Sequence, residues 1–151
     1  MKRHAQRGSS LPEMAIAAGC LLLLMFGIVD FGRAMYTYGF VAQLARQGAR
    51  YWIVRGTTSC TNSNSQLPNC NASAAQVTSY VQSLSEGLTT PSSITVTPTK
   101  VSCPNSGGAL PTAAPGCTIS VTVSYPFKFM TGILPSAAIT MSSTSTMVVA
   151  Q

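Results

Sequence analysis

The chain has 151 residues and a formal net charge of +6, and only 8% of its residues are charged, against roughly 25% in ordinary soluble domains. This length accommodates one globular domain and an anchoring segment. Residues 1–56 hold seven of the nine basic residues and the long apolar stretches, whereas residues 57–151 are rich in Ser, Thr, Asn, Gly and Pro. The asymmetry argues against an evenly charged soluble domain and predicts an anchor joined to a neutral, turn-rich head.

An apolar segment follows a basic N-terminus. Lys2, Arg3 and Arg7 come first, and the chain then carries no charge from Met14 to Val29. A full membrane span takes about 20 residues, so this segment is short but sufficient if flanking polar groups reach the interface. The positive-inside rule places the basic N-terminus in the cytoplasm. We therefore expect the head to lie on the outer side of the membrane.

Two other uses of an N-terminal apolar segment fit poorly. A cleaved secretory signal needs a small-x-small site soon after its apolar core, and no good site occurs in VDFGRAMYTYGF, which follows this core. A lipoprotein cysteine follows its apolar core, whereas here LLLLMFGIV comes after Cys20. Cys20 is then most simply a small buried hydrophobic residue.

The helical pattern continues beyond the apolar segment. No proline interrupts residues 30–56, and apolar residues recur at intervals of three and four, the period of one helical face: Phe31, Met35, Tyr38, Val41, Ala45, Ala49 and Trp52. Much of the remainder is polar: Arg33, Thr37, Gln43, Gln47 and Arg50. Gly32, Gly39 and Gly48 weaken the helix by about 1 kcal/mol each but permit close helix packing. We expect one helix over residues 11–54, with its apolar face under the head, against a neighbouring protomer, or both along different parts.

The head begins with a second predicted helix, over residues 73–86. Ser73 and Gln76 have the spacing of a capping box, and Gly87 is placed to end the helix in a left-handed conformation. Its apolar face consists of Val77, Tyr80, Val81, Leu84 and Leu88.

Three extended segments follow the second helix, at residues 93–103, 117–129 and 138–150. In the middle one, apolar residues (Ile119, Val121, Val123, Tyr125) alternate with polar ones (Thr118, Ser120, Thr122, Ser124), which is the period of a half-buried strand. The predicted fold class is α+β: a long N-terminal transmembrane and amphipathic helix, then a small head with one helix and an antiparallel sheet of about three or more strands.

Four cysteines lie in the polar head: Cys60, Cys70, Cys103 and Cys117. They indicate two disulfides in an oxidising compartment, which agrees with a head outside the membrane. The sequence-local pairs, Cys60–Cys70 and Cys103–Cys117, are the simplest of three connectivities. A metal site is poorly supported because no CxxC pair is present and the single histidine, His4, precedes the apolar segment.

Nothing in the head indicates catalysis. It contains no histidine, one carboxylate at Glu86, and no nucleophile with a plausible base, and solvent-facing strand positions account for its Ser and Thr residues. We expect no enzyme activity, no catalytic residue and no cofactor.

Glu13 stands at the start of the apolar segment, where a charge is least expected. One interpretation is a capping box, in which Ser10 caps the helix and Glu13 returns a bond to the backbone. Pro12 is compatible with a first helical turn. The other interpretation is an assembly role, and it depends on the residues before Glu13.

A basic leader, Gly8, and a glutamate at the fifth residue after it resemble the start of type IV prepilins and pseudopilins. A closer resemblance is to TadE-like proteins, the minor pseudopilins of tight-adherence pili. It covers residues 7–52 and is strongest in GIVDFGRAMYTY and ARQGARY. The family's strand regions are similar to ISVTVSYPFKF and STSTMVV, whereas residues 57–117 match less well.

The resemblance implies that a prepilin peptidase cleaves after Gly8 and frees a cationic amine at Ser9. That amine would pair with Glu13 of a neighbouring subunit and offset the roughly 2.5–3.5 kcal/mol cost of a carboxylate in the bilayer. It also implies three regions: a leader over residues 1–8, a membrane and assembly helix over residues 9–56, and a disulfide-stabilised head over residues 57–151. Implied partners are membrane lipid, this chain and other pilins, at the bacterial cytoplasmic membrane and, after assembly, in an extracellular pilus.

Asp30 and Arg33 depart from the long uncharged stem of major type IV pilins. Their spacing permits a local ion pair of about 0.2–0.5 kcal/mol on an exposed helix, or pairing between protomers in a filament. We therefore include both residues among the candidate assembly residues.

Two other functions stay open at this point. One is an uncleaved, membrane-tethered binding module or adhesin whose disulfide-bonded head binds a ligand. The other is a DNA-binding minor pilin that uses Arg46, Arg50 and Arg55, although nucleic acid is the less favoured partner because three of the positive charges belong to the leader.

Overall fold

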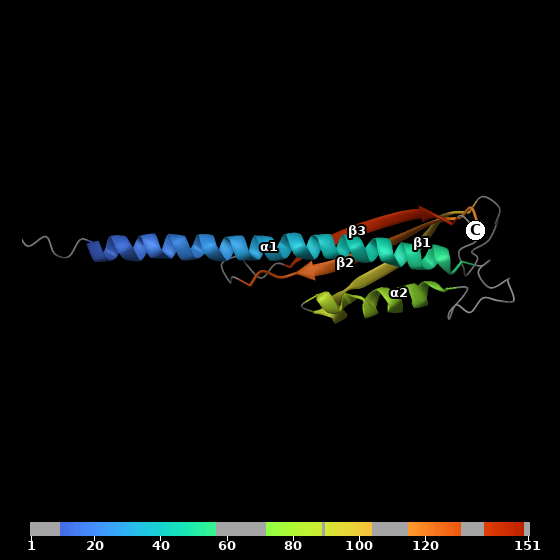
Figure 1. Cartoon of the computed structure of the whole chain (residues 1–151), viewed down its shortest axis with the longest axis horizontal. Coiled ribbons are helices and arrows are strands. Elements are labelled where there is room, and N and C mark those ends of the chain that lie inside the picture. The colour runs from blue at the N-terminus through green and yellow to red at the C-terminus, as the bar shows by residue number, and fades with distance from the viewer. Residues whose placement is uncertain (1–9, 57–71, 89, 104–114, 131–137, 150–151) are drawn as a thin grey trace, which may run out of the picture.

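The computed structural model describes residues 10–56, 72–88, 90–103, 115–130 and 138–149. Its main elements are two helices and three strands: α1 (Ser10–Val54), α2 (Ala74–Ser83), β1 (Thr95–Ser102), β2 (Thr118–Phe127) and β3 (Ile139–Val148). Two short 3₁₀ helices, η2 (Ser85–Gly87) and η3 (Pro91–Ser93), lie between α2 and β1. The predicted α+β class is confirmed: one long helix extends far beyond a small head (Figure 1).

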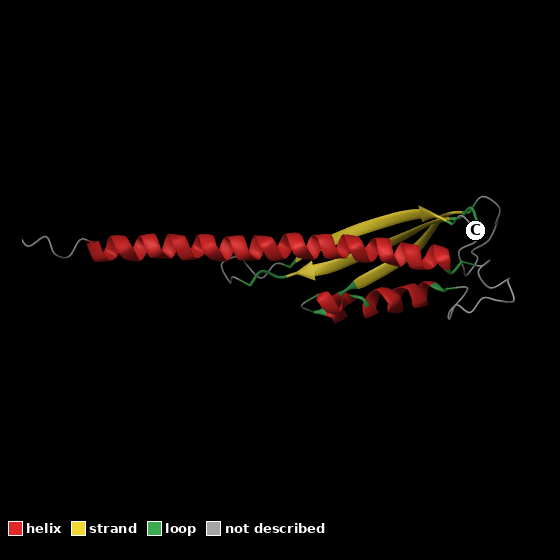
Figure 2. Ribbon diagram, in the orientation of Figure 1, coloured by secondary structure: helices red, strands yellow, loops and turns green. Residues whose placement is uncertain are grey.

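The three strands form one antiparallel sheet in the order β1-β2-β3. Val123 of β2 pairs with Val96 of β1 and with Ser143 of β3, so these side chains share one face. Both helices pack against this sheet, α1 on β2 and β3, and α2 on β1 (Figure 2). The head is therefore a two-layer sandwich of helices on a sheet.

The predicted alternation along β2 is confirmed. Its apolar positions are all buried: Ile119, Val121, Val123, Tyr125 and Phe127. The opposite face of the sheet carries mostly Ser and Thr, and Thr122 and Thr144 hydrogen-bond across it at 2.9 Å. Ser120 is buried as well, because β2 is the central strand and has a neighbour on each side.

The core joins the C-terminal half of α1 to α2 and β2. Trp52 and Val41 of α1 are fully buried, together with Val77 and Val81 of α2. Gly48 makes the closest approach: a Cβ atom there would lie 2.7 Å from Val81 Cγ2 and 3.2 Å from Val121 Cγ1. Of the three glycines expected to permit close packing, Gly48 does so within the chain, whereas positions 32 and 39 have open space around them.

The apolar face predicted for α1 lies under the head only from Val41 onwards. Val41, Ala45, Ala49 and Trp52 are buried under the head, whereas Phe31, Met35 and Tyr38 are 68%, 58% and 54% exposed. Between Asp30 and Tyr38 the buried positions are Asp30 and Thr37, and we expected Thr37 on the polar side. A position next to a buried one is rotated by about 100° around a helix of 3.6 residues per turn, so the apolar pattern there faces away from the sheet.

The start of α2 has the predicted capping box. The backbone N–H of Ser73 donates to Gln76 Oε1 at 2.9 Å, and the Gln76 N–H donates to Ser73 Oγ at 3.4 Å. The predicted end is wrong: α2 stops at Ser83, and Gly87 does not adopt a left-handed conformation. Position 87 instead favours glycine for lack of space, because a Cβ atom there would lie 2.9 Å from the Phe40 ring of α1.

Cys103 and Cys117 form a disulfide that joins the end of β1 to the start of β2. The turn before Cys117 contains Gly116 with a φ of 80°, a left-handed conformation that glycine adopts readily. The predicted pair Cys60–Cys70 lies outside the described residues. Cys20 is a free thiol and is exposed, not buried as expected, because the head does not extend along that part of α1.

Candidate assembly and anchoring site

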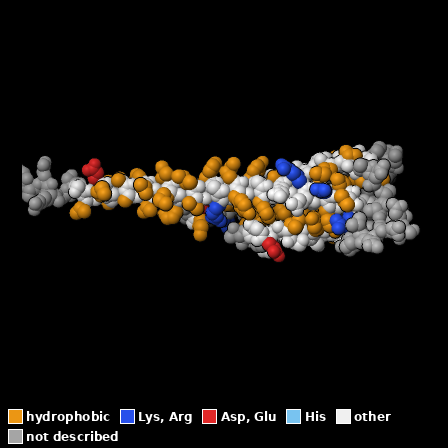
Figure 3. All heavy atoms as spheres, in the orientation of Figure 1, with side chains coloured by type: hydrophobic (Ala, Val, Ile, Leu, Met, Phe, Trp, Pro, Cys, Tyr) orange, Lys and Arg blue, Asp and Glu red, His pale blue; other side chains and the backbone are white. Residues whose placement is uncertain are grey.

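The N-terminal half of α1 exposes its apolar side chains on every side. Between Leu11 and Val29 every residue is exposed, including six consecutive large apolar ones, Leu21 to Phe26. Figure 3 shows these hydrophobic side chains projecting along the stem beyond the head. The helix is long and apolar enough to cross a membrane, and its apolar window is almost wholly unburied. A core helix of a soluble protein would be covered, so this half of α1 has the surface of a membrane anchor.

Glu13 lies in the first turn of α1 and is exposed. The predicted capping box with Ser10 is not formed, because Ser10 is itself the first helical residue and an N-cap needs a non-helical backbone. Within the part of the chain that the structure describes, Glu13 makes no hydrogen bond or ion pair with another residue. A carboxylate at a helix N-terminus interacts favourably with the helix dipole. This interaction does not occupy the two carboxylate oxygens of Glu13, so both are available to another partner. Gly8 and Ser9, the predicted processing site, lie outside the described residues.

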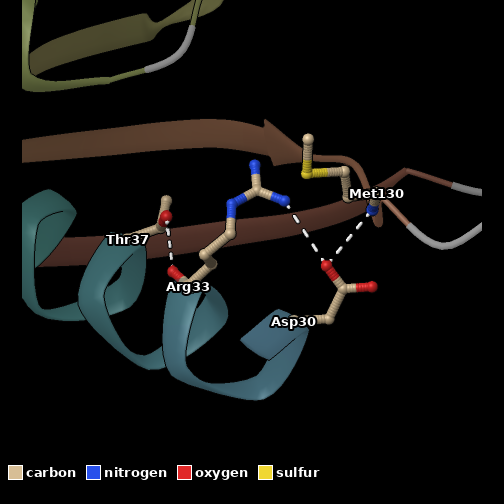
Figure 4. Close-up of polar contacts among 4 residues, drawn as sticks. All are labelled: Asp30, Arg33, Thr37 and Met130. Carbon is tan, nitrogen blue, oxygen red and sulfur yellow. Dashed lines mark hydrogen bonds and ion pairs between the residues drawn. The ribbon is translucent and has the colours of Figure 1, made fainter. Parts of the chain in front are cut away.

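Asp30 and Arg33 form the predicted ion pair, but it is a buried connection to the head (Figure 4). Arg33 Nη1 lies 3.4 Å from Asp30 Oδ1, and the backbone N–H of Met130, just after β2, donates to the same oxygen at 3.3 Å. Asp30 is only 4% exposed. The Arg33 guanidinium also lies over the Phe127 ring, 5.6 Å from its centroid. We call these four residues the Asp30 junction.

The Asp30 junction is held from α1 as well as from the sheet. Thr37 Oγ1 donates a hydrogen bond of 2.8 Å to the Arg33 carbonyl one turn earlier. A buried carboxylate is costly unless charged and neutral donors compensate it, and here an arginine and a backbone amide do so. The junction therefore fixes where the head meets α1, directly after the apolar segment ends at Val29.

Sequence reasoning found two members of this junction and missed Phe127 and Met130. The available signal was the rarity of acidic residues: the whole chain has three, and Asp30 is one of them. A carboxylate kept in such a chain indicates a specific partner. That partner is a backbone N–H, which every non-proline residue has, so its position could not be found from residue types.

The basic residues considered for DNA binding divide into two groups. Arg46 and Arg50 are exposed on α1. Arg55 lies over the Tyr51 ring at 4.1 Å, and Tyr51 stacks on Tyr80 of α2 with ring centroids 4.1 Å apart. Arg55 therefore contributes to the packing of α1 on α2, and it lines one open pocket together with Arg50.

The head has two lysines at opposite ends of the sheet. Lys100 of β1 pairs with Ile119 near the start of β2, and partial burial lowers the pKa of its ammonium group because desolvation disfavours the charged form. Lys128 directly follows β2 and is exposed at the end of the head that contacts Asp30. The two positions therefore differ in environment and in distance from the membrane-anchor surface.

These features define a class of protein: a single apolar anchor helix that continues into a small α+β head. Residues 8–50 match the family model of TadE-like proteins, in agreement with the resemblance seen in the sequence. The match ends within α1 and does not extend over α2 or the sheet. Comparisons with curated proteins and with solved structures found no match.

Proposed function

We propose that this chain is a structural pseudopilin subunit of a tight-adherence pilus or related secretion filament. The TadE-like family suggests a pilus-associated, pseudopilin-like role. In our proposal a prepilin peptidase removes residues 1–8 by cleaving after Gly8. The mature chain then assembles with copies of itself and other pilins through residues 9–54, first in the cytoplasmic membrane with the head outside and then in the filament.

The observation that carries this proposal is the division of α1 into a covered half and an uncovered half. The head buries one side of α1 from Asp30 onwards, whereas the side chains from Leu11 to Val29 are exposed. Each large apolar side chain gains about 1.5–3 kcal/mol when it leaves water, so this surface requires lipid or neighbouring helices. A stem that can exchange lipid for identical neighbours is what a pilin needs to leave the membrane and polymerise.

Glu13 would set the register of that exchange. Its carboxylate is exposed at the start of the apolar segment and has no partner within the described residues. A cationic amine at Ser9 of an adjacent subunit would neutralise it where an unpaired charge is costly. Because the chain has so few carboxylates, this pairing would stabilise one axial offset between neighbouring stems more than any other. Asp30 is less suited to this role, since Arg33 and Met130 of the same chain already bind it.

The first test is mass spectrometry of the N-terminal peptide, on protein from native membranes and from sheared filaments. The proposal expects a chain that begins at Ser9. A chain that keeps residues 1–8 would contradict processing and favour a membrane-tethered binding module.

The second test replaces Glu13 by Gln. A charge-assisted hydrogen bond contributes about 1.5–3 kcal/mol, so we expect at least a roughly tenfold loss of assembled subunit with membrane insertion unchanged. Glu86→Gln is the matched control, because Glu86 is an exposed carboxylate of the head, on η2. Normal filaments from the Glu13→Gln variant, or equal losses from both variants, would overturn the assembly role.

A further inference from the structure

A groove of about 470 Å³ opens at the end of the head nearest the apolar half of α1. Its polar lining comes from three elements: Arg33 of α1, Lys128 after β2, and Thr90, Ser92 and Ser93 in and next to η3. The aromatic residues Tyr125, Phe127 and Phe129 line it as well. We call it the basal groove. Figure 1 shows that the C-terminal end of β2, where the groove lies, points along α1 toward its N-terminal half.

The Asp30 junction sets the height of the basal groove relative to the anchor. The hydrogen bond from the Met130 N–H to Asp30 holds this end of the head one residue beyond Val29, the last residue of the uncharged segment. If that segment spans the bilayer, the groove lies at the level of the lipid headgroups. This placement depends on the anchor and not on which side of the membrane the head occupies.

Other side chains at this level have the character of a membrane interface. Met130 is 79% exposed beside the groove, and Phe31, Tyr36 and Tyr38 are exposed on α1. Residues 31–38 rise about 10 Å along the helix, so these rings lie in the headgroup layer and just outside it. Tyr and other amphipathic rings favour this layer, with the ring in the apolar part and the polar tip in water.

The chemistry of the groove fits a phosphate group. Two cationic side chains and several hydroxyls line it, and no carboxylate is among the lining residues. Asp30 binds Nη1 of Arg33, but a guanidinium carries five N–H donors in a planar fork, and the Arg33 side chain is 34% exposed. Lys128 is exposed, lines the groove and adds a compact positive charge.

We propose that the basal groove binds the phosphate of an anionic phospholipid headgroup, with Lys128 and Arg33 as its cationic ligands. The inference rests on the membrane anchoring in the proposed function. A lipid held there would fix the depth and tilt of the head on the bilayer before assembly. Extraction into a filament would then require release of that lipid.

The test uses the full chain reconstituted with phosphatidylcholine and phosphatidylglycerol, released into detergent and examined by native mass spectrometry for retained phosphatidylglycerol. One Lys or Arg near an anionic surface contributes about 1 kcal/mol, so Lys128→Gln should lower the retained fraction about fivefold. Lys128→Arg should restore it. Lys100→Gln is the control, since it removes the same charge at the far end of the sheet, and it should retain lipid as the unaltered chain does.

Three results would overturn the inference. Equal retention in the Lys128→Gln variant would show that the groove does not hold the lipid. Equal losses from Lys128→Gln and Lys100→Gln would show only general charge attraction. Displacement of the lipid by millimolar inorganic phosphate would identify a site for soluble anions instead. Carbonate extraction of the same membranes tests the anchoring separately. If the chain is not anchored, carbonate will release all of it; if it is anchored, the chain will stay in the membrane whatever the lipid result.

Discussion

The two halves of α1 have the same secondary structure and opposite environments. From Met14 to Val29 the helix is uncharged on all sides and every residue is exposed, whereas from Asp30 to Val54 one side is buried and the other faces solvent. The difference follows from how apolar residues are distributed around the axis. A helix that is apolar all round suits lipid, and one with an apolar stripe suits a protein surface. One continuous helix can therefore lie in lipid along one part and against a protein surface along another, if the pattern of its apolar residues changes at a defined position.

The change occurs at the Asp30 junction. Asp30 is the first buried residue of α1, and its partner Met130 lies three residues after β2 ends at Phe127, whose ring contacts Arg33. A charged residue at this point limits how far the helix can enter the bilayer. It also commits the head to one position along the stem. The comparison between the two halves can be tested by equivalent changes in each.

The largest expected effect is the difference in stability between two variants, each with one aromatic residue truncated, one in each half of α1. Trp52→Ala removes a fully buried side chain from the core and should lower the free energy of unfolding of the head by about 3–5 kcal/mol. Phe26→Ala, in the exposed half, should leave it within about 0.5 kcal/mol. Chemical denaturation in detergent, followed by amide hydrogen exchange of β2, measures both. Similar losses from the two variants would contradict the division of α1.

A smaller effect is expected at the boundary itself. Asp30→Ala leaves Arg33 and the Met130 N–H without their shared acceptor and should cost about 1–3 kcal/mol. Asp30→Asn keeps a neutral acceptor and should cost less. Hydrogen exchange should show the Met130 amide losing protection first. Unchanged protection of that amide in the Asp30→Ala variant would mean that the junction does not hold the head.

The smallest effects on stability are expected from replacing two glycines of α1 by alanine. The two substitutions should change the stability in opposite directions. Gly48→Ala places a methyl group against Val81 and Val121 and should destabilise the head by up to about 2 kcal/mol, the overpacking cost less the gain in helix propensity. Gly39→Ala meets open space and should stabilise the helix by up to about 1 kcal/mol. Thermal unfolding of the two variants gives both signs. Stabilisation by Gly48→Ala would show that α1 and α2 can separate without loss.

Patterns that repeat along the chain could be predicted from the sequence. The extent of α1, the three strands, the alternation along β2 and the capping box of Ser73 and Gln76 all agree with the structure. Each depends on residues within a few positions of one another. The close contact between Gly87 and the Phe40 ring could not be predicted in the same way, because Phe40 lies in a distant part of the chain.

The features of the candidate site also fall into those that the sequence predicts and those that depend on tertiary contacts. The uncharged segment and the isolated Glu13 can be read directly from composition and spacing. The exposure of Phe31, Met35 and Tyr38, and of Cys20, depends on how far along α1 the head extends. That extent is set by the length of the sheet and by where Met130 meets Asp30.

By itself, the sequence determined that this chain has an apolar anchor and an α+β head, because hydrophobic periodicity and turn residues act locally. Three features depend on contacts between distant segments: the face of α1 that the head covers, the glycine at a close contact, and the burial of Asp30 where the stem meets the head. The physical reason is that burial and the pairing of a carboxylate with a backbone amide are made between segments far apart in sequence. The basal groove has the same origin, since the residues that line it come together only when β2 ends beside Arg33.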